Sequence, residues 1–201
     1  MMKSDGAGDF PVIKACQEGD RDAFRVLFES YRDRTYTIAY HFCSDDTMAS
    51  DITQQVFLKL FDSIRQFRFN SEFTTWLYRL VANVCMDEHR KRRRFLQWPT
   101  SSTGGDIDVS VVAESSVPAS IEEHIGAREM NSQVRRAVAS LSPKLRLVIL
   151  LRYFEDFSYD EMASVLGCSS GTVASRLNRG HQQLAKQLSH LRQEFGRAIS
   201  L

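Results

Sequence analysis

A group of hydroxyl and guanidinium side chains near residue 175 has the composition needed to read the edges of DNA bases. Small hydroxyl groups and arginines on the leading turns of a helix fit the major groove, where they meet base edges and phosphates. The same composition also occurs on solvated helices that bind no DNA, so this stretch alone leaves both interpretations open. The group consists of Ser170, Thr172, Ser175, Arg176 and Arg179.

A second group has the composition of a site for single-stranded nucleic acid. The run from Arg90 to Arg94 is entirely basic, and it ends a predicted helix that carries Trp76. Basic side chains attract the phosphate backbone, while aromatic rings stack against unpaired bases. The helix macrodipole favours one or two arginines at the C-terminal end of a helix, but it does not require so long a run.

Catalysis has no comparable set of residues. The sequence contains no glycine-rich phosphate loop and no metal-ligand cluster, and its histidines are scattered. We therefore expect no enzyme activity, no cofactor and no metal. The four cysteines lack the spacing of metal ligands or of a disulfide framework, and we expect buried, reduced thiols. They are Cys16, Cys43, Cys85 and Cys168.

Two short helices joined by a tight turn are predicted to position the first group. Ser158 and Glu161 have the spacing of a capping box at the start of the first helix. Gly167 can adopt the left-handed conformation that ends it, and Ser169 or Ser170 can cap the second helix. The second helix has an apolar side that we expect to face inward, formed by Val173, Leu177, Leu184 and Leu188.

The rest of the chain is predicted to be helical in two blocks. Apolar periodicity covers residues 9–41 with a break near Gly19, then 47–67, then a segment from Ser71 or Thr74 to Arg94. Helix resumes near Ser120, breaks at Ser142-Pro143, and continues over residues 144–154. The fold class expected is all-α, with two small helical domains joined by a flexible linker, the second a helix-turn-helix domain. The expected bounds are 1–98, 99–127 and 128–201.

Composition supports a protein with a buried core and an uneven charge. The 201 residues are 43% hydrophobic and 25% charged, and the net charge is +1. The linker region carries acidic but no basic side chains, whereas basic residues outnumber acidic ones from residue 128 onward. No apolar run approaches the roughly 20 residues of a membrane helix, and the N-terminus lacks a signal-peptide pattern. We expect a cytoplasmic protein without membrane insertion.

Taken in order, these features closely resemble the bacterial RNA polymerase sigma factors of the extracytoplasmic-function (ECF) type, in the sigma-70 family. The resemblance runs from about Asp9 to Leu188. It is carried by Asp51-Ile52-Thr53-Gln54-Gln55-Val56-Phe57, which is similar to a polymerase-docking helix, and by Thr75-Trp76-Leu77, Ala82-Asn83 and Asp87-x-x-Arg90, which are similar to a promoter-melting helix. Leu141-Ser142-Pro143, Leu166-Gly167 and Gly171-Thr172-Val173-x-Ser175-Arg176 resemble the reader of the upstream promoter element.

This resemblance implies three binding surfaces. The surface for the β′ clamp helices of core RNA polymerase would comprise Asp51, Gln54, Gln55, Phe57 and Leu58, with Gln55 where the family often has an acidic residue. The surface for the opened −10 element would comprise Phe69, Phe73, Trp76, Arg79, Asn83, Arg90, Arg92 and Arg93. The surface for the −35 duplex would comprise Ser170, Thr172, Val173, Ser175, Arg176 and Arg179. The resemblance further implies contact with the polymerase β flap and control by an anti-sigma factor.

One alternative function competes with this interpretation. A conventional transcriptional regulator would use the helix-turn-helix on duplex DNA without being a polymerase subunit, while its first domain sensed a ligand or partner. Such a regulator predicts tight duplex binding by the protein alone, and a dimer. It leaves the composition between Trp76 and Arg94 unexplained.

Overall fold

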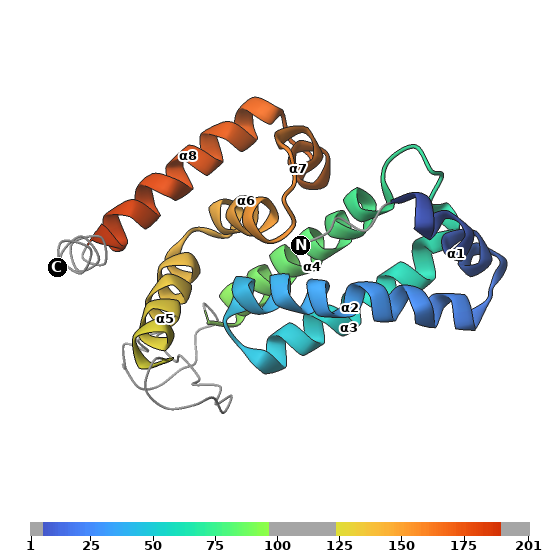
Figure 1. Ribbon diagram of the computed structural model, residues 1–201, viewed down its shortest axis with the longest axis horizontal. Coiled ribbons are helices and arrows are strands. Elements are labelled where there is room, and N and C mark those ends of the chain that lie inside the picture. Colours follow the sequence, from blue (N-terminus) through green and yellow to red (C-terminus); the bar gives the residue numbers. More distant parts are fainter. Residues whose placement is uncertain (1–5, 97–123, 190–201) are drawn as a thin grey trace. The chain divides into compact units, whose positions relative to one another are not determined.

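The computed structural model describes residues 6–96 and 124–189, and every regular element within these ranges is a helix (Figure 1). The chain divides into two compact units, Met1–Ser115 and Ser116–Leu201. The all-α prediction is thereby confirmed. The predicted linker falls largely on residues 97–123, outside the described ones, and helix resumes at His124. No helix in the described part of the chain is long and apolar enough to cross a membrane.

Within residues 6–96, the first unit contains four α-helices and one short 3-10 helix. They are α1 (Gly6–Glu18), α2 (Arg21–Cys43), α3 (Asp46–Ser63), η1 (Ile64–Gln66) and α4 (Phe73–Leu96). The predicted break lies between α1 and α2, where the Asp20 carboxylate accepts hydrogen bonds from the backbone N–H groups of Asp22 and Ala23 at 2.8 and 3.1 Å. Asp45 caps α3 in the same way by accepting from the Met48 N–H. These side chains satisfy N–H groups that have no partner within the helix.

The core of the first unit lies between α2, α3 and α4, because each of these helices buries an apolar stripe at helical spacing. The fully or almost fully buried side chains include Leu27, Tyr31, Ile38, Ile52, Val56, Leu60, Leu77, Val81 and Val84. Helix α1 is tied to the turn before α4 by Gln17, whose side-chain amide donates to the carbonyls of Ile64 (2.9 Å) and Phe67 (2.7 Å). The turn that carries Phe67 and Phe69 is therefore anchored to α1.

All four cysteines are free thiols, but only Cys16 and Cys85 are buried; Cys43 and Cys168 are half-buried. The prediction of buried thiols is thus confirmed for two of them and wrong for the other two. Burial, reinforced by the nearby Asp20 carboxylate, raises the pKa of the Cys16 thiol above its usual value. Cys16 therefore remains protonated and behaves as a small apolar side chain.

The second unit is built on α5 (His124–Ser140), α6 (Pro143–Phe154), α7 (Tyr159–Leu166) and α8 (Ser170–Gln187). Its core is formed mainly by α6, which has six buried apolar side chains. They pack against Met162 and Val165 of α7 and Val173 and Leu177 of α8. Gly180 lets α8 approach α6 closely, since a Cβ atom there would lie 3.1 Å from a side-chain carbon of Ile149.

The helix-turn-helix prediction is confirmed by both of its caps. Ser158 and Glu161 form the reciprocal capping box: the Glu161 N–H donates to the Ser158 hydroxyl, and the Ser158 N–H donates to the Glu161 carboxylate at 2.7 Å. Gly167 ends α7 with a φ of 60°. Ser169, one of the two candidates, caps α8 by accepting from the Thr172 N–H at 3.2 Å.

Substitutions at the two glycines of this motif are expected to change the free energy of unfolding in opposite directions. Gly167→Val places a branched side chain at positive φ and is expected to lower the free energy of unfolding by about 1–2 kcal/mol. Gly171→Ala is the matched control, because its nearest neighbour would lie 4.0 Å from the new Cβ and alanine favours helix by about 0.5–1 kcal/mol. Urea unfolding of the full chain checks both, and equal stability of the two variants would contradict the turn geometry.

Candidate nucleic-acid and protein interfaces

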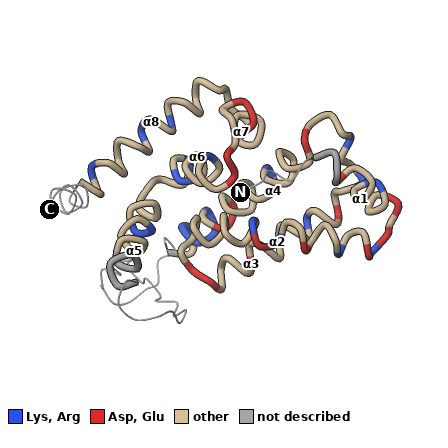
Figure 2. The backbone as a smooth tube through the Cα atoms, in the orientation of Figure 1, with Lys and Arg blue, Asp and Glu red and all other residues tan. Residues whose placement is uncertain are grey.

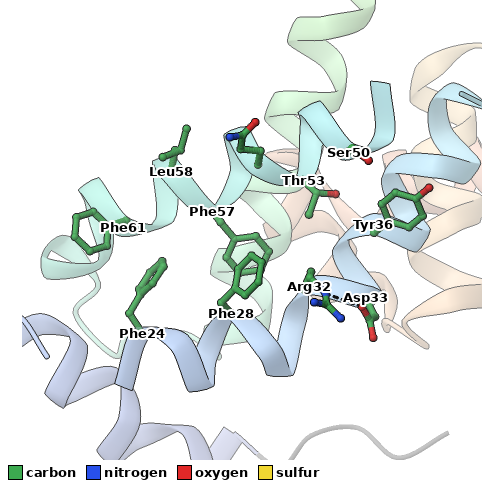
Figure 3. A pocket seen from close by; sticks show the side chains of 11 residues that line it. Phe24, Phe28, Arg32, Asp33, Tyr36, Ser50, Thr53, Phe57, Leu58 and Phe61 are labelled. Carbon is green, nitrogen blue, oxygen red and sulfur yellow. Dashed lines mark hydrogen bonds and ion pairs between the residues drawn. The ribbon is translucent and has the colours of Figure 1, made fainter. Parts of the chain in front are cut away.

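An apolar groove of about 690 Å³ lies between α2 and α3 (Figure 3). Aromatic rings line it in pairs: Phe24 meets Phe61 with centroids 5.1 Å apart, and Phe28 meets Phe57 at 4.7 Å. Leu58 is 58% exposed at the groove and Phe61 is 54% exposed. Apolar side chains this exposed, grouped along one groove, are typical of a surface that another protein covers.

Polar groups close one end of this groove. The Arg32 guanidinium donates to the Asp33 carboxylate at 2.9 Å, and the Tyr36 hydroxyl donates to Asp46 at 2.8 Å. The hydrogen bond to Asp46, followed by partial burial, raises the pKa of Tyr36 to about 12. Tyr36 therefore keeps its proton at neutral pH. The groove thus has an apolar floor and one polar end.

The predicted docking residues are only partly brought together here. Gln54, Phe57 and Leu58 line the groove, whereas Asp51 is exposed and Gln55 half-buried outside its lining. Phe57 is only 5% exposed, so it forms the floor.

Eight residues that line the groove were not predicted as site residues, and the phenylalanines among them are Phe24, Phe28 and Phe61. Phe24 and Phe28 recur four residues apart on α2, and Phe57 and Phe61 do so on α3. These two pairs of phenylalanines, each four residues apart, were the signal in the sequence. Aromatic residues at helical spacing, however, usually belong to a buried core.

A chain of aromatic rings joins the turn before α4 to the first turns of α4. Phe67 lies between Phe69 (4.9 Å) and Trp76 (5.3 Å), and Phe69 also contacts Phe10 of α1 at 4.7 Å. Phe69 has a positive φ of 57° and is partly exposed. Its unusual backbone conformation is held by rings on both sides. The predicted −10 residues Phe69 and Trp76 are thereby brought into one cluster.

The prediction that Phe73 belongs to the −10 surface is wrong, because its side chain is buried. Its side chain is 3% exposed and packs against Tyr31, Phe67 and Trp76 with centroids 5.5, 5.6 and 6.0 Å apart. A ring enclosed in this way cannot stack against a nucleic-acid base. Phe73 instead supports Trp76, which is half-buried and keeps part of its ring accessible.

The polar side of α4 continues from this cluster. Arg79 and Asn83 are exposed, as are Arg90, Arg92 and Arg93 near the helix end. Arg90 donates to Asp87 at 2.5 Å, and Asp87 also pairs with Lys59 of α3 at 3.8 Å. Because these pairs are exposed, each contributes little to stability.

Thr172, Ser175, Arg176 and Arg179 lie on one side of α8, whereas Ser170 lies in its first turn, where its hydroxyl donates to Asp160 of α7. Ser175 and Arg179 are exposed, and Ser170, Thr172 and Arg176 are half-buried. Figure 2 shows Lys and Arg spaced along α8, whereas Asp and Glu gather before α7 and at its start. The Arg176 guanidinium donates to the Cys168 sulfur at 3.5 Å, so the turn helps to orient it.

Val173 corrects the predicted duplex-reading surface. Its side chain has no exposed area and packs in the core of the second unit. It cannot touch a base edge, and it supports α8 from the inside. Helical spacing had also predicted that Val173 faces inward, and this prediction is confirmed.

The fold and these surfaces define a class of protein: two helical units, the second with a helix-turn-helix, and an apolar groove on the first. Family models match both units. The model described as Sigma-70 region 2 matches residues 27–95, and the model described as Sigma-70, region 4 matches residues 131–184.

The relatives identify the family. The chain is 32% identical over 182 residues to the ECF RNA polymerase sigma factor SigW of Bacillus subtilis, covering 89% of this chain and 96% of SigW. It is 30% identical to the RNA polymerase sigma-H factor of Pseudomonas aeruginosa, covering 92% and 96%. The sigma factor RpoE of Bartonella quintana, solved with the anti-sigma factor NepR, shares the fold with a TM-score of 0.65 at 23% identity, over 83% of this chain and 96% of RpoE.

The chain belongs to the ECF RNA polymerase sigma factors. As a member of this family it directs core RNA polymerase to promoters and starts transcription. The regulator that acts without polymerase is thereby set aside.

Proposed function

We propose that the groove between α2 and α3 is the docking site for the β′ clamp helices of core polymerase. The observation that carries this proposal is the exposure of Leu58 and Phe61 beside the rings of Phe24 and Phe28. Covering such side chains contributes about 25 cal/mol for each Å² of apolar surface removed from water. Asp51 and Gln55 form the polar rim of the same interface. The protein then acts in the cytoplasm, where the polymerase is.

The exposed side of α4 and the adjoining aromatic cluster hold the separated −10 strand. Extruding a base costs a few kcal/mol of stacking, and stacking on a ring recovers about 1–3 kcal/mol per base. Trp76 and Phe69 supply the rings, and Arg79 and Asn83 supply hydrogen-bond donors beside them. Strand opening in this account requires no nucleotide hydrolysis, because the protein captures strands that the polymerase exposes.

Helix α8 reads the −35 element as duplex DNA. Arg176 and Arg179 offer guanidinium donors to guanine or to phosphate, and Ser170, Thr172 and Ser175 offer hydroxyls near the start of the helix. The second unit also contacts the polymerase β flap, which sets its distance from the first unit along the promoter.

An anti-sigma factor controls the protein by covering the α2/α3 groove. The structural relative from Bartonella quintana was solved with its anti-sigma factor NepR, and a groove with exposed apolar side chains suits a second, competing protein. Purification of the protein from its own cells should return a partner that competes with core polymerase. Recovery of polymerase subunits alone under every growth condition tried would argue against such control.

Run-off transcription tests the proposed function as a whole. The protein is added to sigma-free core polymerase with fragments of its own genome. Discrete transcripts are expected, and their aligned start sites should reveal a shared two-part promoter motif. The proposal fails if the folded protein yields no transcripts and instead binds duplex DNA alone at nanomolar concentrations.

Replacement of Arg92 and Arg93 by glutamine is expected to reduce the salt dependence of binding to single-stranded −10 DNA. Each phosphate contact on a single strand contributes about 0.7 to the slope of log K against log salt, so the double variant should lose about 1.4. Titrations of the polymerase complex at several salt concentrations measure the slope. Arg25→Gln, an exposed arginine on α2, is the control and should leave it unchanged. An unchanged slope in the double variant would remove these arginines from the surface.

A further inference from the structure

One contact joins the first turns of the two helices of the helix-turn-helix. The hydroxyl of Ser170, the first residue of α8, donates to a carboxylate oxygen of Asp160 in the first turn of α7 at 2.5 Å. Asp160 is exposed and Ser170 is half-buried. An acidic side chain beside a DNA-reading helix costs affinity through repulsion by phosphates, so its position there calls for a gain in selectivity.

The contact fixes the hydrogen-bonding character of Ser170. A serine hydroxyl has one proton to donate and two lone pairs, while an ionised carboxylate can only accept. Because Asp160 takes the single proton of Ser170, the hydroxyl can offer only lone pairs to a third group. The free oxygen of Asp160 also offers only lone pairs. Together the two side chains form a site that accepts and does not donate.

The two arginines of the reading surface have the opposite character. Arg176 and Arg179 can only donate, and Arg176 is already directed by its bond to the Cys168 sulfur. Thr172 is paired with Ser169, with 2.9 Å between the two hydroxyl oxygens. The side chains of Asp160 and Ser170 therefore accept hydrogen bonds, whereas those of Arg176 and Arg179 donate them.

We propose that Asp160 is a specificity-determining residue, which acts with Ser170 to select a base-edge amino group in the upstream promoter element. In the major groove the amino donors are N6 of adenine and N4 of cytosine, whereas guanine and thymine present acceptors. Each base pair has one such amino group, so the acceptor pair selects the orientation of the base pair. On the contacted strand it favours adenine over thymine and cytosine over guanine. This inference rests on the proposed role of α8 in reading duplex DNA.

The experiment measures base preference at each position of a randomised upstream element, using the full chain bound to core polymerase. Asp160→Asn keeps the size and one acceptor of the side chain but adds an amide donor. It is expected to reduce the preference for adenine and cytosine at one position roughly 2- to 10-fold, the effect of one hydrogen bond. Ser170→Ala should reduce the preference at the same position.

Asp156→Asn is the matched control, since it removes an exposed carboxylate from the same unit, whereas the Ser170 hydroxyl donates to Asp160. It should leave every preference unchanged. If Asp160→Asn instead tightens binding to all sequences equally, Asp160 faces phosphate and the inference is overturned. If the unmodified protein selects no upstream sequence at all, the proposed role of α8 fails first, and that result is distinct from a loss confined to the variant.

Discussion

Leu58→Glu is expected to weaken binding to core polymerase by about 100-fold or more. The Leu58 side chain is 58% exposed at the α2/α3 groove, and covering such a side chain contributes about 1.5–3 kcal/mol. The variant loses this contribution and also places an unpaired carboxylate in an apolar interface, which costs further free energy. A total loss of about 2.7 kcal/mol or more corresponds to the expected change in affinity.

Val26→Glu is the matched control for this prediction. Val26 is an apolar side chain on α2, 48% exposed, and it does not line the groove. The same chemical change should therefore leave polymerase binding within a few-fold of the unmodified protein. Titration of labelled core polymerase with each variant measures both affinities. Equal binding by the two variants would place the docking surface elsewhere.

Trp76→Ala is expected to reduce strand opening at the −10 element about 5- to 100-fold while polymerase binding is retained. The Trp76 ring is half-buried against Phe67 and Phe73, and in the proposed function its accessible part stacks on an unpaired base. Loss of one base–ring contact corresponds to about 1–3 kcal/mol. The reactivity of promoter thymines toward permanganate reports the fraction of open complexes.

Because Trp76 also packs on its neighbours, the control must separate stacking from stability. Trp76→Phe keeps an aromatic ring and should recover much of the opening. A template with a preformed bubble over the −10 element should restore transcription by Trp76→Ala, since the cost of opening has been removed. If the alanine variant opens the promoter normally, the aromatic cluster of α4 has no part in melting.

Local signals in the sequence predicted the caps and turns correctly. The capping box of Ser158 and Glu161 and the left-handed Gly167 depend on residues within a few positions of one another. Helical periodicity also located most of the buried stripes. These features follow from backbone hydrogen bonding and side-chain spacing, so they need no knowledge of tertiary contacts.

Features that depend on how two helices pack against each other could not be predicted from the sequence. Phe24 and Phe28 have the spacing of a core stripe, and only the packing of α2 on α3 shows that they line a groove. Phe73 has an aromatic ring of the kind that stacks on bases, but three other rings enclose it. The bond between Asp160 and Ser170 joins two helices across the turn, and its existence depends on the angle at which they meet.

The most direct test of the divided surfaces compares Trp76→Ala with Arg176→Ala on one promoter, bound to core polymerase. Protection of the −35 element from cleavage and permanganate reactivity at the −10 element are measured in the same complexes. We expect Trp76→Ala to lose reactivity while upstream protection remains, and Arg176→Ala to lose upstream protection while a preformed −10 bubble is still transcribed. Loss of both signals together in each variant would contradict the assignment of opening and duplex reading to separate units.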